Sequence, residues 1–290
     1  MRFPLLSFAL LGGLLANGYR AAAQYDPNVA HRYVQPLELW PELQAELSLK
    51  NGDYLLLSVR GERSTDGQGY YATRPLGMDT RRVALAYEHF WNDNWSWGAT
   101  ARYESSARFE TNTTGDLLVP ELLLRHRATI FGGLTFGQRL GVERQFVVNR
   151  FYHGGSGPEG QFWTRLRVDV ERLFPLGGTA DGFGLRPRLS YAASTHLRFQ
   201  KDENAPAERT IQWTSLRAEV GVRLSPKVDF TPWFAYQTQY RQDLVFTDAT
   251  GTIPVSGGKI NAVYPTLGLD VRFTITGGDK ADRPQLPTQH

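Results

Sequence analysis

The residues of this chain best suited to nucleophilic chemistry lie together in one Gly-rich segment. His153 and Ser156 are three positions apart, and Glu159 follows them. A serine nucleophile needs a base within hydrogen-bond reach and a third group that orients the base. The residue types fit, but Pro158 breaks the glycine spacing of a nucleophile elbow. The sequence favours a surface loop here, predicts no catalytic residue, and leaves hydrolysis of lipid or peptide as an alternative.

Metal and cofactor chemistry has weaker support in the sequence. His89, His126 and His196 stand alone without the spacing of metal ligands, and each is expected at an interface or rim. The chain has no cysteine, which excludes disulfides and thiolate metal sites. No glycine motif that would cradle a phosphate is present. We therefore expect neither a metal nor a cofactor.

Arginines and carboxylates recur at every second position along the chain. Only five of the 32 basic residues are lysine, and the rigid fork of arginine suits confined ion-pair networks. Because a β-strand turns successive side chains to opposite faces, this spacing places the charges on one face of each strand. The predicted charged face comprises Arg60, Glu62, Arg82, Glu88, Arg102, Glu104, Arg125, Arg127, Arg139, Glu143, Arg165, Arg167, Asp169, Glu171, Arg186, Arg188, Arg217, Glu219, Arg223, Asp270 and Arg272.

Eleven segments carry this alternation and must position the charges. They are residues 36–48, 54–63, 80–91, 95–106, 117–130, 134–147, 161–174, 183–198, 211–224, 228–241 and 260–276. Their lengths suit tilted strands that cross a membrane, which need about 9–11 residues. Short turns alternate with long polar connections, the latter near residues 64–79, 107–116, 148–160, 199–210 and 242–259. This rhythm is typical of outer-membrane barrels, whose short turns lie on one rim.

The predicted fold is an all-β, antiparallel, up-and-down transmembrane β-barrel whose charged face lines the lumen. Bacterial single-chain barrels have even strand numbers, so twelve strands are predicted, with ten as the alternative. Either residues 25–35 hold an additional strand, or one of the eleven segments is not a strand. On lipid, one such arginine would cost about 2–4 kcal/mol at the midplane, so the charged face must turn inward if a membrane is involved. A soluble sandwich with its charged face in water is the competing fold.

The two ends of the sequence have their own signatures. Arg2, the apolar run 3–16 and the small residues Ala21-Ala22-Ala23 predict a signal peptide over residues 1–23. An irregular lead (24–35), the barrel domain (36–276) and a polar tail (277–290) are expected to follow. The formal charge of +3 falls to +1 without Arg2 and Arg20, which gives no case for nucleic acid.

Aromatic residues gather near the predicted strand ends, as at membrane–water boundaries. Trp91, Trp95 and Trp97 flank one short turn, and Trp213 and Trp233 continue the pattern. These observations predict a monomer in the bacterial outer membrane, in contact with its lipid and assembled by the barrel-assembly machinery.

Three segments also carry a family resemblance. Leu39-Trp40-Pro41-Glu42-Leu43, residues 53–60 and the closing residues 267–273 resemble an uncharacterised family of bacterial outer-membrane β-barrels. The resemblance covers about residues 36–276 and implies fold and location, but no activity. One departure is the polar tail after Phe273, because many such barrels end on a terminal aromatic that the insertion machinery reads.

Three functions remain open from the sequence. The first is a barrel with an Arg/Glu-lined lumen in a structural or passive solute-passage role. The second is a barrel enzyme that acts on lipid or peptide at the outer rim. The third is a soluble periplasmic β-sandwich that binds a ligand or partner.

Overall fold

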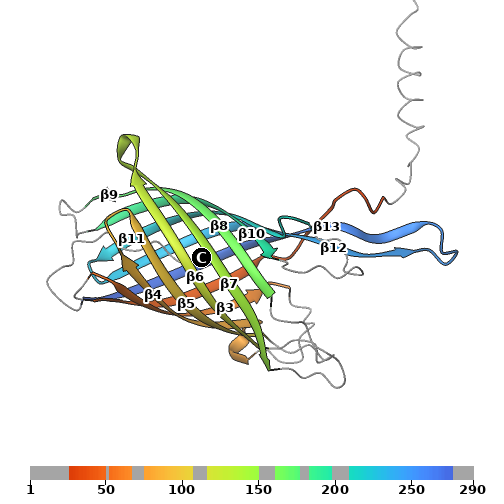
Figure 1. Cartoon of the computed structure of the whole chain (residues 1–290), viewed down its shortest axis with the longest axis horizontal. Coiled ribbons are helices and arrows are strands. Elements are labelled where there is room, and N and C mark those ends of the chain that lie inside the picture. The colour runs from red at the N-terminus through yellow and green to blue at the C-terminus, as the bar shows by residue number, and fades with distance from the viewer. Residues whose placement is uncertain are drawn as a thin grey trace, which may run out of the picture.

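The protein forms a closed β-barrel (Figure 1). The computed structural model describes residues 26–49, 52–66, 75–106, 116–149, 161–176, 183–197 and 209–276. Within these residues the barrel strands are β2 (Glu38–Ser48), β3 (Tyr54–Ser64), β4 (Thr80–Phe90), β5 (Trp95–Ser106), β6 (Asp116–Thr129), β7 (Leu134–Asn149), β8 (Gln161–Arg172), β10 (Gly184–Leu197), β11 (Trp213–Ser225), β12 (Val228–Thr247) and β13 (Pro254–Thr276). The predicted barrel is confirmed, and the sandwich is wrong because the hydrogen-bonded ladder closes on itself.

Closure of the barrel corrects the predicted strand number. Each described barrel strand pairs antiparallel with the next, but β13 pairs with β2 in parallel, from Thr266 opposite Glu38 to Thr276 opposite Ser48. In an up-and-down order, an odd number of strands leaves the first and last strands pointing the same way. The eleven segments seen in the sequence all form strands in a closed barrel of about the predicted size, which has eleven barrel strands rather than twelve or ten and is mixed rather than purely antiparallel.

Two short strands add to the eleven without widening the barrel. Strand β1 (His31–Val34) lies in the lead and pairs with Ile260–Val263 of β13, beside the stretch that β2 occupies. It therefore continues the line of β2 rather than adding a place to the circumference. Strand β9 (Phe174–Pro175) likewise continues β8 along the edge of β10.

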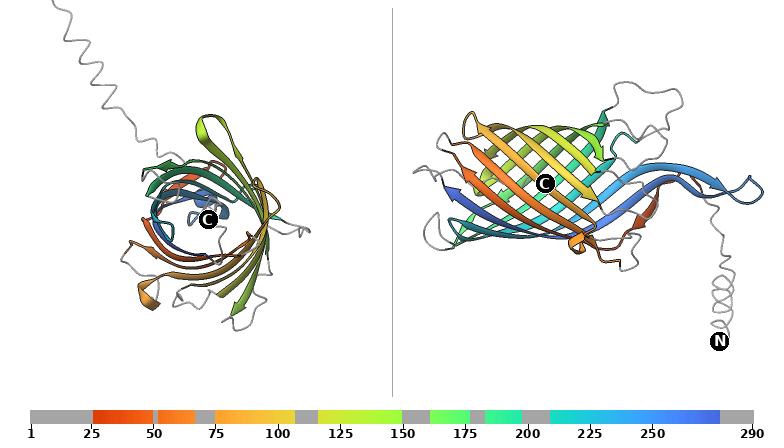
Figure 2. Two further views of the ribbon diagram at one scale, coloured as in Figure 1. Left: turned by 90° about the vertical axis from the view of Figure 1, so that its left-hand side faces the viewer. Right: turned by 90° about the horizontal axis from the view of Figure 1, so that it is seen from below.

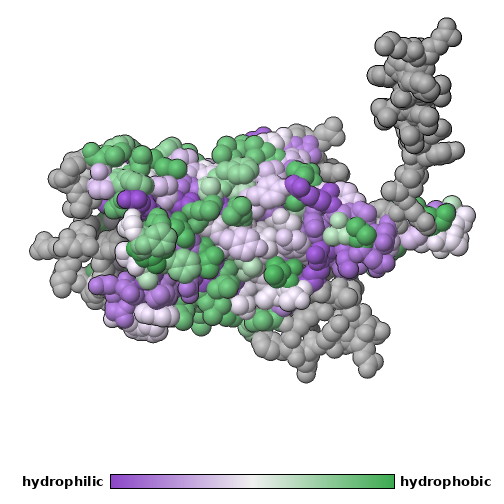
Figure 3. Space-filling model, turned by 90° about the horizontal axis from the view of Figure 1, so that it is seen from above, coloured by the Kyte–Doolittle hydropathy of each residue, from purple (hydrophilic) through white to green (hydrophobic). Residues whose placement is uncertain are grey.

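Polarity is inverted relative to a soluble protein, as β5 illustrates. Ser96 and Thr100 are buried, whereas Trp97 and Tyr103 on the alternate positions are exposed. Apolar side chains cover much of the barrel body in Figure 3, and hydrophilic ones gather toward the base of the projecting hairpin. The exposed residues include Val83, Leu85, Leu140, Val142, Leu166, Val170, Leu216, Val220 and Leu267. In the described part of the chain, no helix is long and apolar enough to span a membrane.

The connections differ at the two ends of the barrel. Short turns join β2 to β3, β4 to β5, β6 to β7 and β11 to β12, all at one end. Gly132 and Gly133 in the β6–β7 turn have φ angles of 66° and 72°, which glycine adopts without a steric cost. We call the half of the interior nearest these turns the short-turn half, and the other the long-loop half.

One expected long loop, residues 242–259, proves to be mostly strand. Residues of β12 and β13 pair out to Thr247 opposite Pro254, so the two strands continue beyond the barrel as a projecting hairpin (Figure 2). The hydroxyl of Thr250 donates to the carboxylate of Asp248 at 2.8 Å in the hairpin tip, which holds the pKa of Asp248 below its usual range. The polar composition of this segment matched that of a loop, but it reflects solvent on both faces of a two-stranded ribbon.

Aromatic residues divide between the two surfaces of the barrel. Trp91, Trp95 and Trp97 are 59%, 38% and 37% exposed near the β4–β5 turn. Trp233 departs from the predicted pattern because it is 3% exposed and shares the inner side of its strand with Asp229 and Gln237. Trp213 also faces inward, where it stacks on Tyr264 at 5.7 Å. These two tryptophans are therefore parts of the interior and not of a rim.

Candidate functional site: the charged interior of the barrel

The structure encloses the charged side chains in the barrel interior. The most buried of the predicted residues are Arg60, Glu88, Arg125, Arg139, Glu143, Arg167, Asp169, Glu171, Arg188, Arg217, Glu219, Asp270 and Arg272. Those of intermediate exposure are Glu62, Arg82, Arg102, Glu104, Arg127, Arg165, Arg186 and Arg223. Isolated charges in such surroundings would be costly, so each requires partners.

An ion-pair chain follows the wall of the long-loop half. Arg82 Nη2 lies 2.9 Å from Glu104 Oε1, and Arg102 Nε lies 2.5 Å from the same oxygen. Arg102 also reaches across β6 to Glu143, which Arg165 approaches at 3.9 Å. These side chains retain contact with solvent, up to 29% exposure for Arg165. The chain therefore ties β4, β5, β7 and β8 together while leaving the guanidinium groups accessible from the interior.

Pairing in the short-turn half is more enclosed. Arg125 Nη1 donates to both oxygens of Glu88 at 2.8 and 2.9 Å, and the two side chains are 5% and 1% exposed. Arg188 contacts Glu219 and Glu171. Residues Glu46, Glu88, Arg125, Arg139, Glu171, Arg188 and Arg272 form what we call the short-turn plug.

One arginine links the side chains across the parallel pairing of β13 with β2. Arg272 donates from Nε to Gln44 at 2.8 Å and from Nη1 to Glu46 at 3.0 Å. Gln44 in turn donates to Glu42 at 2.7 Å. Side chains of the first strand thus complete the ring of charge around the barrel.

Two tryptophans form the centre of the interior. Trp40 and Trp233 meet edge to face at 5.9 Å, with Arg60 over the first ring at 4.4 Å and Arg217 over the second at 3.9 Å. The indole of Trp233 also donates to Asp270 at 2.8 Å. A Cβ on Gly268 would come within 2.0 Å of the Trp233 ring, so glycine at this inner position makes room for the indole.

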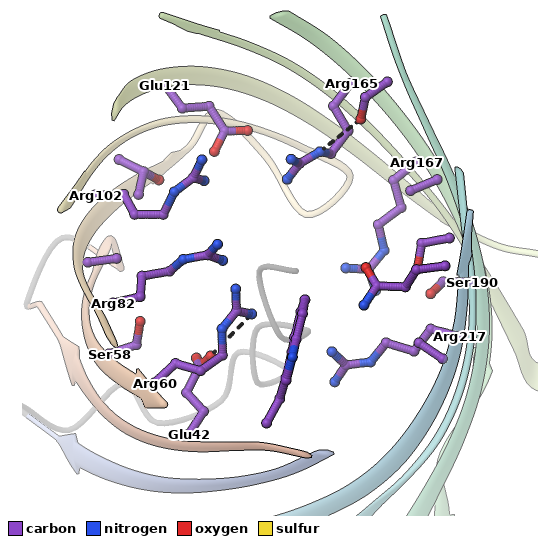
Figure 4. Close-up of a pocket in the computed structure, with 18 of the residues that line it drawn as sticks. Glu42, Ser58, Arg60, Arg82, Arg102, Glu121, Arg165, Arg167, Ser190 and Arg217 are labelled. Carbon is purple, nitrogen blue, oxygen red and sulfur yellow. Dashed lines mark hydrogen bonds and ion pairs between the residues drawn. The ribbon is translucent and has the colours of Figure 1, made fainter. Parts of the chain in front are cut away.

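Arginine side chains converge on a cavity between the tryptophans and the long-loop end (Figure 4). This arginine cavity has a volume of about 200 Å³ and is lined by Arg60, Arg82, Arg102, Arg165, Arg167 and Arg217, with Glu42 and Glu121 as its acidic residues. A second cavity of about 450 Å³, which we call the vestibule, lies toward the long-loop end. Arg82, Arg102 and Arg165 line both cavities, so the two adjoin along the wall.

The polar face of β2 was not among the charged residues predicted from the sequence. Glu42, Gln44 and Glu46 are 5%, 2% and 1% exposed and alternate with the outward-facing Leu43 and Leu47. The same period of two was available as a signal in residues 36–48. Glu121 and Asp229, which the alternation also predicts on the charged face, are buried in the interior.

The histidines lie near the barrel ends and pack on aromatic rings. The ring centroid of His126 is 4.5 Å from that of Trp95, and His196 stacks on Trp163 at 5.4 Å. His89 contacts Asp53 at 2.9 Å. No group of three or more potential ligands in the described ranges could hold a metal ion. The loop with His153, Ser156 and Glu159 lies outside the described residues.

Comparison of the chain with models of known protein families and with curated proteins finds no match. The charged interior of the barrel therefore carries the functional interpretation.

Proposed function

We propose that the chain is a bacterial outer-membrane β-barrel in which the charge-paired interior has a structural role. The observation that carries the proposal is the inverted polarity of the wall. Leu122 is 66% exposed and Leu85 53%, while Arg188 on the inner face is 3% exposed. Monomeric soluble proteins rarely expose large contiguous apolar surfaces, whereas lipid requires them.

Within this proposal, the remaining expectations fit together. The chain is exported by residues 1–23, is inserted by the barrel-assembly machinery, and works as a monomer in contact with lipid. Membership of the uncharacterised outer-membrane barrel family rests on the three sequence segments named above. The buried ion pairs of the short-turn plug favour a braced wall rather than an unobstructed pore.

Substitution of an outward leucine tests the membrane placement. Leu122→Arg in the middle of β6 is expected to reduce folding stability in lipid by about 2–4 kcal/mol, because arginine would enter the hydrocarbon layer. Leu76→Arg is the matched control, since Leu76 is 89% exposed and lies in the short helix η1 (Pro75–Gly77) outside the barrel strands. Heat-modifiable migration of the membrane fraction reports the folded barrel. Equal behaviour of both variants, or recovery of the chain in the soluble periplasmic extract, would refute the placement.

Passive solute passage is the second candidate. The position of the arginine cavity next to the vestibule favours it, because the two spaces together extend from the long-loop end toward the middle of the barrel. Planar-bilayer recordings separate the two roles. A braced, closed barrel gives no steady ion current, whereas passage gives a current from well-folded protein.

A further inference from the structure

The lining of the arginine cavity carries more basic than acidic side chains. Its lining includes six arginines and two glutamates, and the vestibule adds Arg209 and Arg241 together with Glu104 and Glu143. Partner carboxylates such as Glu62 and Glu219 lie on the wall beside these arginines but do not line the cavity. A guanidinium has five N–H donors, and a carboxylate engages at most two of them in a fork. The interior therefore presents donors to the cavity even where its arginines are paired.

Three arginines line both the arginine cavity and the vestibule, and Arg165 is the most exposed of them. Its Nε donates to Ser194 at 3.2 Å, and its Nη2 lies 3.9 Å from Glu143, a longer separation than in most ion pairs of the interior. With 29% of its side chain exposed, Arg165 has both charge and room for a ligand.

The remaining lining fits an organic anion. Ser58, Ser190 and Ser215 supply hydroxyl groups that can donate to an oxyanion, and small side chains at these positions leave the volume. The indoles of Trp40, Trp213 and Trp233 add apolar surface for a carbon skeleton, with one ring face of each covered by Arg60, Tyr264 and Arg217 respectively.

We propose that the arginine cavity binds a small organic polyanion with carboxylate or phosphate groups, which enters through the vestibule. Figure 4 shows Arg82 and Arg102 reaching into the cavity from one wall and Arg217 from the opposite wall, and guanidinium forks suit the oxygens of carboxylates and phosphates. The inference rests on the proposed function only in that an aqueous compartment at the long-loop end supplies the ligand.

Calorimetric titration of the detergent-solubilised full chain tests this site. Citrate carries the carboxylate chemistry, glucose 6-phosphate carries the phosphate chemistry, and glucose and spermidine are the neutral and cationic controls. We expect one or both anions to bind and the controls not to bind, with weaker binding at high ionic strength because salt screens the guanidinium charges. Arg165→Gln should weaken anion binding about tenfold or more, through the loss of a charge-assisted contact.

The matched control is Arg223→Gln, because Arg223 faces the interior at the short-turn end, pairs with Asp229 and lines neither cavity. It should bind the anion with unchanged affinity. If Arg165→Gln does not fold, Arg82→Gln removes a second shared arginine. Absence of anion binding, stronger binding of spermidine, or equal weakening in Arg223→Gln would overturn the site. Fractionation of the same samples distinguishes a failure of the anion site from a failure of the membrane proposal. A chain found outside the membrane contradicts the membrane proposal whether or not anions bind.

Discussion

The two halves of the barrel interior use the same residue types for different results. In the short-turn half, Arg125 and Glu88 are nearly inaccessible and pair within 3 Å. In the long-loop half, Arg82 and Arg165 keep 22% and 29% of their side chains exposed beside a cavity. The alternation of charge is the same in both, so charge alone does not decide whether the interior is filled.

The difference between the halves arises from small residues at inner positions. Ser58, Ala84, Ala192 and Ser215 line the arginine cavity beside its arginines, and no residue of the plug lines it. Their short side chains fill less of the interior than an arginine or glutamate would, so space remains between the arginines of the cavity. This comparison teaches that the inner residues between the charges determine where the barrel is hollow.

The largest expected effect lies in the plug. Arg272→Met leaves the carboxylate of Glu46, 1% exposed, without the guanidinium that now lies 3.0 Å away. Removal of one partner from a buried ion pair typically costs about 3–5 kcal/mol. We expect a loss of this size in the free energy of unfolding, measured by urea denaturation of the barrel in lipid vesicles. If Arg272→Met lost less unfolding free energy than the substitution of an arginine in the long-loop half, the short-turn half would not be the more enclosed one.

Replacement of both members of a buried pair sharpens the same point. Glu88→Leu alone leaves Arg125 buried and should be strongly destabilising, whereas Glu88→Leu with Arg125→Leu should recover most of the loss. The physical reason is that an apolar pair of similar volume has no desolvation penalty to offset. A double-mutant cycle on the unfolding free energies measures the coupling. Losses that simply add would mean that the two side chains do not act as a pair in the folded barrel.

A substitution at the boundary of the two halves has an intermediate effect. In Gly268→Ala, the new methyl group would meet the Trp233 ring, so the indole must leave its position beside Asp270. Overpacking of this kind costs about 1–3 kcal/mol. We expect lower stability and a shifted tryptophan emission, and Trp233→Leu in the same chain should relieve the clash. An unchanged emission spectrum in Gly268→Ala would show that the indole does not depend on this glycine.

The sequence predicted the wall better than its closure or its contents. A period of two is a local property, so the inward direction of Arg167 or Glu219 follows from the neighbouring residues alone. The parallel pairing of β13 with β2 joins residues more than two hundred positions apart, and no local pattern specifies it. The hairpin beyond residue 242 was missed because solvent on both faces removes the apolar alternation. The cavity could not be predicted because the alternation specifies which residues face inward, but not how much space the small ones leave between side chains from opposite walls.

The smallest expected effect lies in the long-loop half and completes the comparison. Arg82→Gln removes contacts to Glu62 at 3.5 Å and to Glu104 at 2.9 Å. Both carboxylates keep another arginine, since Glu62 lies 2.9 Å from Arg60 and Glu104 lies 2.5 Å from Arg102. The side chains of Glu62 and Glu104 also keep 17% and 15% exposure, so solvent can hydrate the charge that is left.

A pair in such surroundings contributes about 0–1 kcal/mol, as surface pairs do. The free energy of unfolding of Arg82→Gln in lipid vesicles should therefore stay within about 1 kcal/mol of the parent chain, several-fold below the loss in Arg272→Met. Added salt should narrow even this difference, because ions reach the cavity and screen its charges, but cannot reach the plug. A loss in Arg82→Gln that equals the loss in Arg272→Met and ignores salt would mean that both halves are equally dry, and the distinction between plug and cavity would fail.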